Sequence, residues 1–141
     1  MLSKTGIHAI RAIAALAELD EWEFAGAVSL AEKIGVPRNY LGKLLQNLSH
    51  EGLVESQKGS GGGFRLARDS SEISLYDIIN PIEHTGERMG CILGRQSCSE
   101  DTPCPLHVKW KNVRDQYIGL LKTTSVFDLI QDSKTYTSIF S

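Results

Sequence analysis

The stretch that decides the fold is Leu30-Ala31-Glu32-Lys33-Ile34-Gly35-Val36-Pro37-Arg38-Asn39-Tyr40-Leu41. Ser29 and Glu32 have the spacing of a capping box, so we expect a short helix to begin at Ser29. A tight turn at Gly35 ends that helix, and a second helix runs from Arg38 to about Glu51. The apolar side of the second helix consists of Leu41, Leu44, Leu45 and Leu48. Two helices joined by such a turn predict a helix-turn-helix unit.

Helical and β patterns flank this unit. Residues 3–20 place apolar side chains at helical spacing and predict a first helix. After Gly52, which suits the end of a helix, residues 53–56 and 64–67 predict two short strands around the glycine-rich run 58–63. We expect this hairpin to form a wing beside the two helices.

Short helices flank a cysteine-containing loop in the second half of the chain. A capping box at Ser74 predicts a brief helix that ends before Pro81, and another at Ser125 predicts a small terminal helix. Between them, a loop over 84–105 precedes a helix over 106–121. That helix has a heptad seam, and such a seam usually packs on another helix; it consists of Leu106, Trp110, Val113, Tyr117 and Leu120.

These elements predict a mainly α protein with a small β-wing. We expect a winged helix-turn-helix domain over residues 1–80 and a cysteine-rich loop over 81–105. Residues 106–141 would form a long helix and a C-terminal tail.

Charge is distributed unevenly along the 141 residues, although the net charge is only −2. Residues 36–68 carry a local charge of +3, and residues 71–107 carry −4. A basic block over a helix-turn-helix favours binding to duplex DNA. The expected contacts lie at the start of the second helix and in the wing, and they are Arg38, Asn39, Tyr40, Lys43, Lys58 and Ser60.

Other interpretations of this block carry less weight. Helix pairs with a glycine turn also occur in many all-helical domains. The glycine run could indicate a phosphate-binding loop, but it lacks a Lys-Ser/Thr pair after its last glycine and precedes a strand. The block combines a helix-turn-helix, a basic hairpin and a local positive charge. Together these features favour DNA binding over the other two interpretations.

All cysteines of the chain, Cys91, Cys98 and Cys104, lie with His107 in one short run. Thiolates and imidazole bind zinc or iron–sulfur clusters. The run lacks the closely paired cysteines of typical structural zinc sites, so an iron–sulfur cluster is favoured and zinc stays open. The two-residue offset from Cys104 favours His107 as a further ligand. His8 in the first helix is a weak candidate, since a symmetric dimer could bring it near the partner's loop.

Composition limits the class of protein further. Three cysteines cannot form a closed disulfide framework. The chain shows neither a cleavable signal nor an apolar run of membrane-spanning length, so we expect no membrane association and a cytoplasmic location. No Ser/His/Asp, paired-carboxylate or nucleotide-binding pattern stands out, and we do not expect an enzyme.

The chain resembles the family of winged-helix bacterial regulators that includes IscR, NsrR and RirA. The resemblance rests on residues 4–12, 30–41, 47–54 and the wing 58–67, together with the three-cysteine loop. It implies a homodimer held by the helix over 106–121, with two winged-helix units that bind a palindromic operator in double-stranded DNA.

The resemblance also implies an iron–sulfur cluster bound by the three cysteines. By position, these cysteines and His107 match the thiolates and the histidine of IscR. The first cysteine spacing is one residue longer than in IscR and NsrR. Ile7 stands where NsrR-like members place a carboxylate ligand from the partner. This favours His107 as fourth ligand and [2Fe–2S] over [4Fe–4S].

We therefore expect a homodimeric transcription regulator. We expect a repressor rather than an activator, because members of the family that the chain resembles are more often repressors. Its operator affinity would be switched by a cluster that senses redox state, nitric oxide or iron status. Two rivals are a zinc-stabilised DNA-binding protein without a sensing role and a small iron–sulfur electron carrier.

Overall fold

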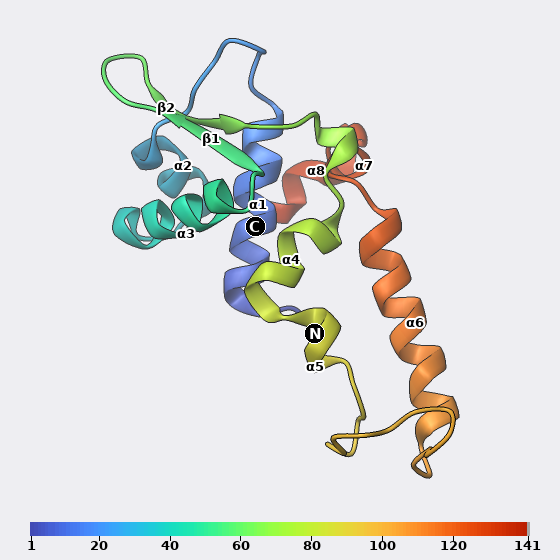
Figure 1. Ribbon diagram of the computed structural model, residues 1–141. Coiled ribbons are helices and arrows are strands. Elements are labelled where there is room, and N and C mark those ends of the chain that lie inside the picture. The colour runs from blue at the N-terminus through green and yellow to red at the C-terminus, as the bar shows by residue number, and fades with distance from the viewer. Residues whose placement is uncertain (141) are drawn as a thin grey trace.

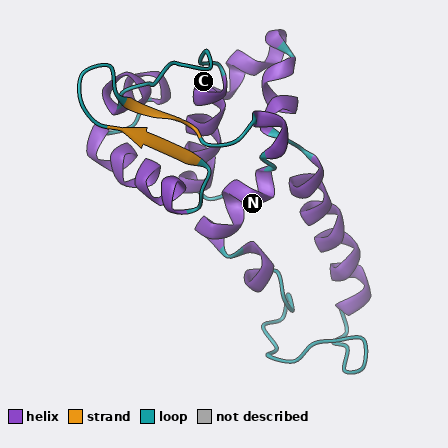
Figure 2. Ribbon diagram, turned by 45° about the horizontal axis from the view of Figure 1, so that its top comes forward, coloured by secondary structure: helices purple, strands orange, loops and turns teal. Residues whose placement is uncertain are grey.

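The structure, a computed structural model, describes residues 1–140, apart from the side chains of residues 133 and 134. Its elements follow in the order α1 (Lys4–Ala17), α2 (Ala27–Ile34), α3 (Arg38–His50), β1 (Val54–Gln57), β2 (Gly63–Leu66), η1 (Ser70–Glu72), α4 (Leu75–Glu83), α5 (Thr85–Arg88), α6 (His107–Thr123), α7 (Val126–Gln131), α8 (Ser133–Tyr136) and η2 (Thr137–Phe140). The protein is thus mainly α with a two-stranded sheet, which confirms the predicted fold class (Figure 2).

Helix α1 is the centre of the structure, with α2, α3 and the wing on one side and α4 on the other (Figure 1). It contacts α2, α3, α4, α7 and β2. Small side chains dominate its buried face, so neighbouring elements approach closely; the fully buried positions include Ala9, Ala12, Ile13 and Ala14. The side chain of Val126, at the start of α7, completes the same core, although it lies more than a hundred residues from α1 in sequence.

The helix-turn-helix forms as predicted, but its first helix begins earlier. Gly35 ends α2 in the left-handed conformation, with φ of 80°. Helix α2 starts at Ala27 after Gly26, so the predicted capping box at Ser29 is wrong. The Ser29 hydroxyl instead donates to the Gly26 carbonyl at 3.1 Å, because the chain turns into the helix directly after Ala25 pairs with Phe64 of the wing.

The wing is an antiparallel pair of strands, shifted by about one residue from the prediction. Val54 pairs with Leu66, and Gln57 pairs with Gly63. Gly63 has a φ of 141°, and a side chain there would run into the backbone of Ala25. The strand therefore starts at a glycine that the sequence pattern assigned to the tip.

Helix α4 is longer than predicted. The capping box of Ser74 and Asp77 is confirmed. The prediction that the helix ends before Pro81 is wrong, because α4 continues to Glu83 with Pro81 inside it. Proline removes only one helical hydrogen bond at this position, and the buried side chains of Ile78 and Ile79 hold the helix against the core.

Helix α6 stands beside α4 and extends away from the body toward the cysteine loop (Figure 1). The loop contains the short helix α5, which the sequence pattern did not predict. The capping box at Ser125 opens α7 as predicted. The Tyr136 hydroxyl donates to the Ala14 carbonyl at 3.0 Å and ties the tail to α1. In the part of the chain that the structure describes, no helix has the length and apolarity needed to cross a membrane.

Two glycine substitutions should have opposite effects on stability. Gly63→Ala should lower the free energy of unfolding by about 1–3 kcal/mol, because alanine is strained at this φ and collides with Ala25. Gly42→Ala, in open space inside α3, should raise it by about 0.5–1 kcal/mol. Urea denaturation followed by circular dichroism measures both values. Equal stability of Gly63→Ala and the wild-type protein would contradict the wing geometry.

Candidate metal centre and nucleic-acid interface

The structure brings the three cysteines together. Their Sγ atoms all lie within 4.8 Å of one another, and those of Cys91 and Cys104 are 3.7 Å apart. Cys104 is buried, whereas Cys91 and Cys98 are half-buried. Cys104 follows Cys91 by thirteen positions, so the loop between α5 and α6 must fold back on itself to form this group.

His107 lies beside this group as the first residue of α6. Its Nδ1 atom is 3.3 Å from the Sγ atom of Cys98. Its Nε2 atom is buried and has no hydrogen-bond partner among the described residues. A buried imidazole nitrogen without a partner costs free energy unless it meets a ligand.

Hydrogen bonds inside the cysteine loop fix its shape. The Arg95 guanidinium donates to the Thr102 carbonyl at 3.2 Å, and the Thr102 backbone donates to the Ser99 hydroxyl at 3.3 Å. These bonds close the segment between Cys98 and Cys104. The loop therefore has local order that does not depend on the thiols alone.

Two side chains of α6 fasten the loop to that helix. The Trp110 indole N–H donates to the Gly90 carbonyl at 2.5 Å, directly before Cys91. The Lys111 ammonium pairs with the Glu100 carboxylate between Cys98 and Cys104. The sequence pattern assigned Trp110 to seam packing alone, and no motif links residues twenty positions apart in this way.

The thiols differ in acidity. A backbone hydrogen bond from Arg95 is the largest cause that lowers the pKa of Cys91, to about 7, with smaller contributions from Leu93 and the neighbouring thiols. A backbone hydrogen bond from Cys104 favours the Cys98 thiolate, but burial and the neighbouring thiols outweigh it and raise the Cys98 pKa. Thiols this close resist ionising together unless a cation compensates their charge.

This donor set fits a thiophilic metal group. Three sulfur atoms converge on one place, and a buried imidazole nitrogen lacks a partner. Thiolate and imidazole are the ligands of iron–sulfur clusters and of zinc. The geometry thus agrees with either group.

His8 lies elsewhere, in α1, and is not part of the described group of thiols. Its Nδ1 atom is 2.9 Å from the Tyr40 hydroxyl. Burial, and then the positive charges of Arg11 and Lys4, lower the pKa of His8. Within one chain, the side chain of His8 therefore contacts Tyr40 and not a cysteine.

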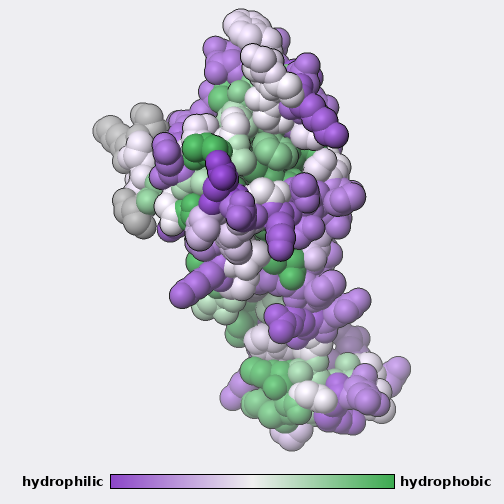
Figure 3. All heavy atoms as spheres, turned by 90° about the vertical axis from the view of Figure 1, so that its left-hand side faces the viewer, coloured by the Kyte–Doolittle hydropathy of each residue, from purple (hydrophilic) through white to green (hydrophobic). Residues whose placement is uncertain are grey.

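The predicted DNA contacts occupy two places on one side of the molecule. Arg38, Asn39 and Lys43 are exposed at the start of α3, whereas Tyr40 is half-buried. Lys58 and Ser60 are exposed at the wing tip. Both α3 and the wing lie on the left of Figure 1, the side that Figure 3 shows, where hydrophilic side chains are numerous (Figure 3).

The lower end of this view carries a green, apolar cluster beside hydrophilic residues (Figure 3). Exposed apolar side chains of the cysteine loop include Ile92 and Leu93, which are 51% and 55% exposed. They follow Cys91 directly in sequence.

Comparison with known proteins gives consistent results. A family model, Rrf2, described as an iron-dependent transcriptional regulator, matches residues 2–132. A protein of Aquifex aeolicus (strain VF5), assigned as an HTH-type transcriptional regulator, is 35% identical over 132 residues, which cover 92% of this chain and 91% of the relative.

Solved structures have the same fold. CymR of B. subtilis, described as the global cysteine regulator, is 25% identical with a TM-score of 0.76, over 93% of this chain and 96% of that chain. T. potens IscR is 26% identical with a TM-score of 0.73, over 94% of this chain and 88% of that chain. The nearly equal scores mean that the backbone alone does not separate these two kinds of regulator.

Removing single charges from the proposed interface should weaken DNA binding in a salt-dependent way. A plot of the logarithm of the association constant against the logarithm of the salt concentration has a negative slope. Arg38→Ala and Lys58→Ala should each make this slope less steep by about 1, because each variant loses one phosphate contact. Fluorescence anisotropy with a labelled random-sequence duplex measures the slope.

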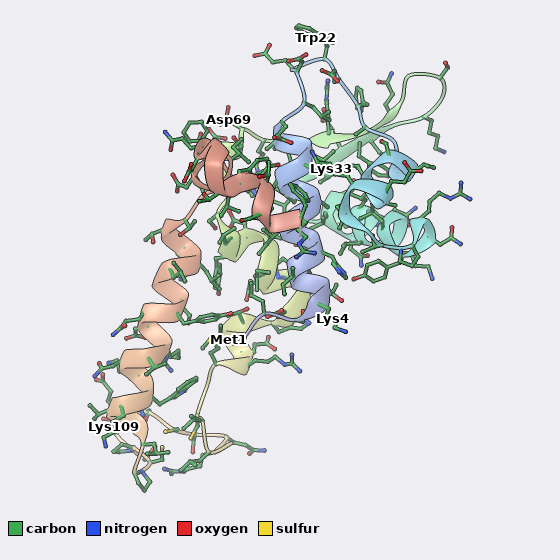
Figure 4. The ribbon with its side chains drawn as sticks, turned by 180° about the vertical axis from the view of Figure 1, so that it is seen from behind. Met1, Lys4, Trp22, Lys33, Asp69 and Lys109 are labelled. Carbon is green, nitrogen blue, oxygen red and sulfur yellow. The ribbon has the colours of Figure 1, made fainter. Side chains whose placement is uncertain are left out.

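Lys109→Ala serves as the control for the same change of charge, because Lys109 lies at the far end of α6 (Figure 4). Its slope should equal that of the wild-type protein. An equal loss in all three variants would mean that net charge, not this interface, governs binding.

Proposed function

Because the chain belongs to the Rrf2 family of transcriptional regulators, whose model spans residues 2–132, we propose that it senses a signal through an iron–sulfur cluster. The protein is a DNA-binding regulator and not an enzyme. We propose that Cys91, Cys98 and Cys104 hold the cluster, that His107 is the fourth ligand, and that the protein represses transcription.

The observation that carries this proposal is the convergence of three thiols beside His107, whose Nδ1 atom lies 3.3 Å from the Sγ atom of Cys98. One nitrogen ligand next to three thiolates is compatible with a [2Fe–2S] cluster, which we favour over [4Fe–4S]. Zinc bound by the same donors is the alternative, and it would give a stabilised DNA-binding protein without a sensing role.

We further propose a homodimer that joins along α6. Val113 and Leu120 on this helix, with Leu106 at its N-cap, recur every seven residues and are 58%, 60% and 39% exposed. Apolar side chains in such a line are typical of helix-to-helix contact. Two copies joined in this way would present two α3 helices to a palindromic operator in double-stranded DNA.

The residues of the loop suggest how binding at the thiols affects the protein. An iron–sulfur cluster supplies redox chemistry and sensitivity to oxidants and nitric oxide when it is bound. Three bound thiolates would fasten the loop at Cys91, Cys98 and Cys104. Without them, the contacts of Trp110 and Lys111 still tie the loop to α6. The loop and α6 are thus the elements whose position we expect to depend on the occupied site.

Iron and sulfide analysis separates this proposal from its rivals. Protein purified without oxygen should be brown and contain iron and acid-labile sulfide in comparable amounts. Colourless protein with zinc would favour the structural-zinc alternative, and coloured protein without salt-dependent affinity for duplex DNA would favour an electron carrier. A regulator of this kind acts where the chromosome lies, so we propose a cytoplasmic location.

Loss of a single thiol should remove the cluster and leave the fold intact. Cys98→Ala should lose the visible absorption and the dependence of DNA affinity on the cluster, because one ligand is missing. Ser97→Ala, the exposed neighbour on the other side, should keep both. Visible spectroscopy, iron content and circular dichroism make the comparison. A Cys98→Ala protein that still changes its DNA affinity with redox state would refute the mechanism.

A charge in the exposed apolar line should break the proposed dimer. Val113→Lys should shift the protein from dimer to monomer in analytical ultracentrifugation, because the lysine would lose its hydration in the contact. Asn112→Lys, an exposed residue that points away from the seam, should stay dimeric. If Val113→Lys and the wild-type protein have the same mass in solution, the contact lies elsewhere.

A further inference from the structure

Tyr40 is directed toward α1, although it follows two exposed residues at the start of α3. Its hydroxyl lies 2.9 Å from Nδ1 of His8 and donates to the Thr5 hydroxyl at 3.3 Å. The rings of Tyr40 and His8 are edge-to-face, with centroids 5.5 Å apart. The first turn of the proposed recognition helix is therefore joined to the start of α1 by polar and aromatic contacts.

The start of α1 is held by α4 through different residues. The Ser3 backbone N–H donates to the Glu83 carboxylate. A Cβ atom at Gly6 would lie only 2.7 Å from Oε1 of Glu83 and 3.0 Å from Cδ1 of Ile79. Glycine at position 6 thus allows the last turn of α4 to rest directly on the first turn of α1.

The end of α4 leads to the thiols. Glu83 is the last residue of α4, and only α5 and a short connection separate it from Cys91. The Arg88 side chain lines a cavity of about 620 Å³ together with Ser3, Thr5 and Glu83. The same side chain lines a second cavity of about 390 Å³ beside Cys91 and Cys98.

Inside one chain, the loop that carries the thiols leads into α5, which contacts α4, and the last residue of α4 contacts the start of α1. The first turns of α1 in turn contact Tyr40 through Thr5 and His8. Figure 4 shows Lys4 in the first of these turns, with α4 and α5 next to it and α3 on the other side. Packed elements of this kind carry coupling when they have two alternative arrangements.

We propose that Tyr40 and Glu83 are positioning residues that transmit the state of the metal centre to the recognition helix within one protomer. This inference rests on the proposed function, because it needs a DNA affinity that depends on the cluster. It assigns Tyr40 a role different from a DNA contact: the hydroxyl sets the orientation of α3 relative to α1. It also differs from a change in the spacing of two protomers, because every contact lies in one chain.

The test compares DNA affinities of cluster-loaded and cluster-free protein on a duplex selected from a random library by the wild-type protein. Tyr40→Phe keeps the ring and removes only the hydroxyl. It should reduce the ratio of the two affinities by about 2–30-fold, the range expected for residues along a coupling route, with an unchanged visible spectrum. Glu83→Ala should reduce the ratio similarly, and Glu72→Ala, an exposed carboxylate in η1 away from this route, should not.

The pattern of changes separates the possible roles of Tyr40. If the hydroxyl contacts DNA, Tyr40→Phe weakens both forms equally and the ratio is unchanged, which overturns the inference. Non-additive effects of Tyr40→Phe and Glu83→Ala on the ratio support a shared route, and additive effects contradict it. A wild-type ratio of 1 would instead refute the sensing function itself.

Hydrogen exchange provides a readout that does not involve DNA. The amides of residues 3–9 should exchange at different rates in the cluster-loaded and cluster-free wild-type protein. This difference should disappear in Glu83→Ala. Equal exchange in both forms of the wild-type protein would contradict a route through α1.

Discussion

The burial of α1 is the constraint on which the rest of the structure depends. Its alanines at positions 9, 12, 14 and 15 are nearly inaccessible to solvent, and α2, α3, α4, α7 and β2 pack against it. Small side chains allow this many neighbours at close range without voids, which is how a short chain obtains one dense core. The helix-turn-helix and the connection toward the thiols are held by different sides of the same helix.

The thiol group does not depend on the packing around α1, because it is a local arrangement far from the main core. Its sulfur atoms are held by hydrogen bonds within a loop and by two side chains of α6. Three neighbouring thiols disfavour joint ionisation, and the partnerless nitrogen of His107 adds a further unsatisfied group. A bound cationic centre would relieve both costs, so the free energy of this region should depend strongly on occupancy.

Local patterns predicted the elements well, and long-range contacts account for the differences. The leucines of α3 and the capping boxes at Ser74 and Ser125 were sufficient to place their helices. The predicted start of α2 and the predicted end of α4 were wrong. Pairing of Ala25 with Phe64 decides the first boundary, and burial of Ile79 decides the second. For the site, spacing along the chain singled out the thiols and His107. It did not reveal that Tyr40 contacts His8, or that Trp110 holds the loop, because both contacts join segments distant in sequence.

The packing of α7 against α1 has a consequence for synthesis of the protein. Val126 lies in the core that surrounds α1, and the hydroxyl of Tyr136 satisfies a carbonyl of the same helix. A ribosome therefore exposes the whole DNA-facing half before the residues that close its core have been made. During translation, the winged part of a nascent chain lacks these final contacts and is less stable than in the finished protein. The helix-turn-helix of an incomplete chain therefore lacks part of the packing that fixes α1 in the finished protein.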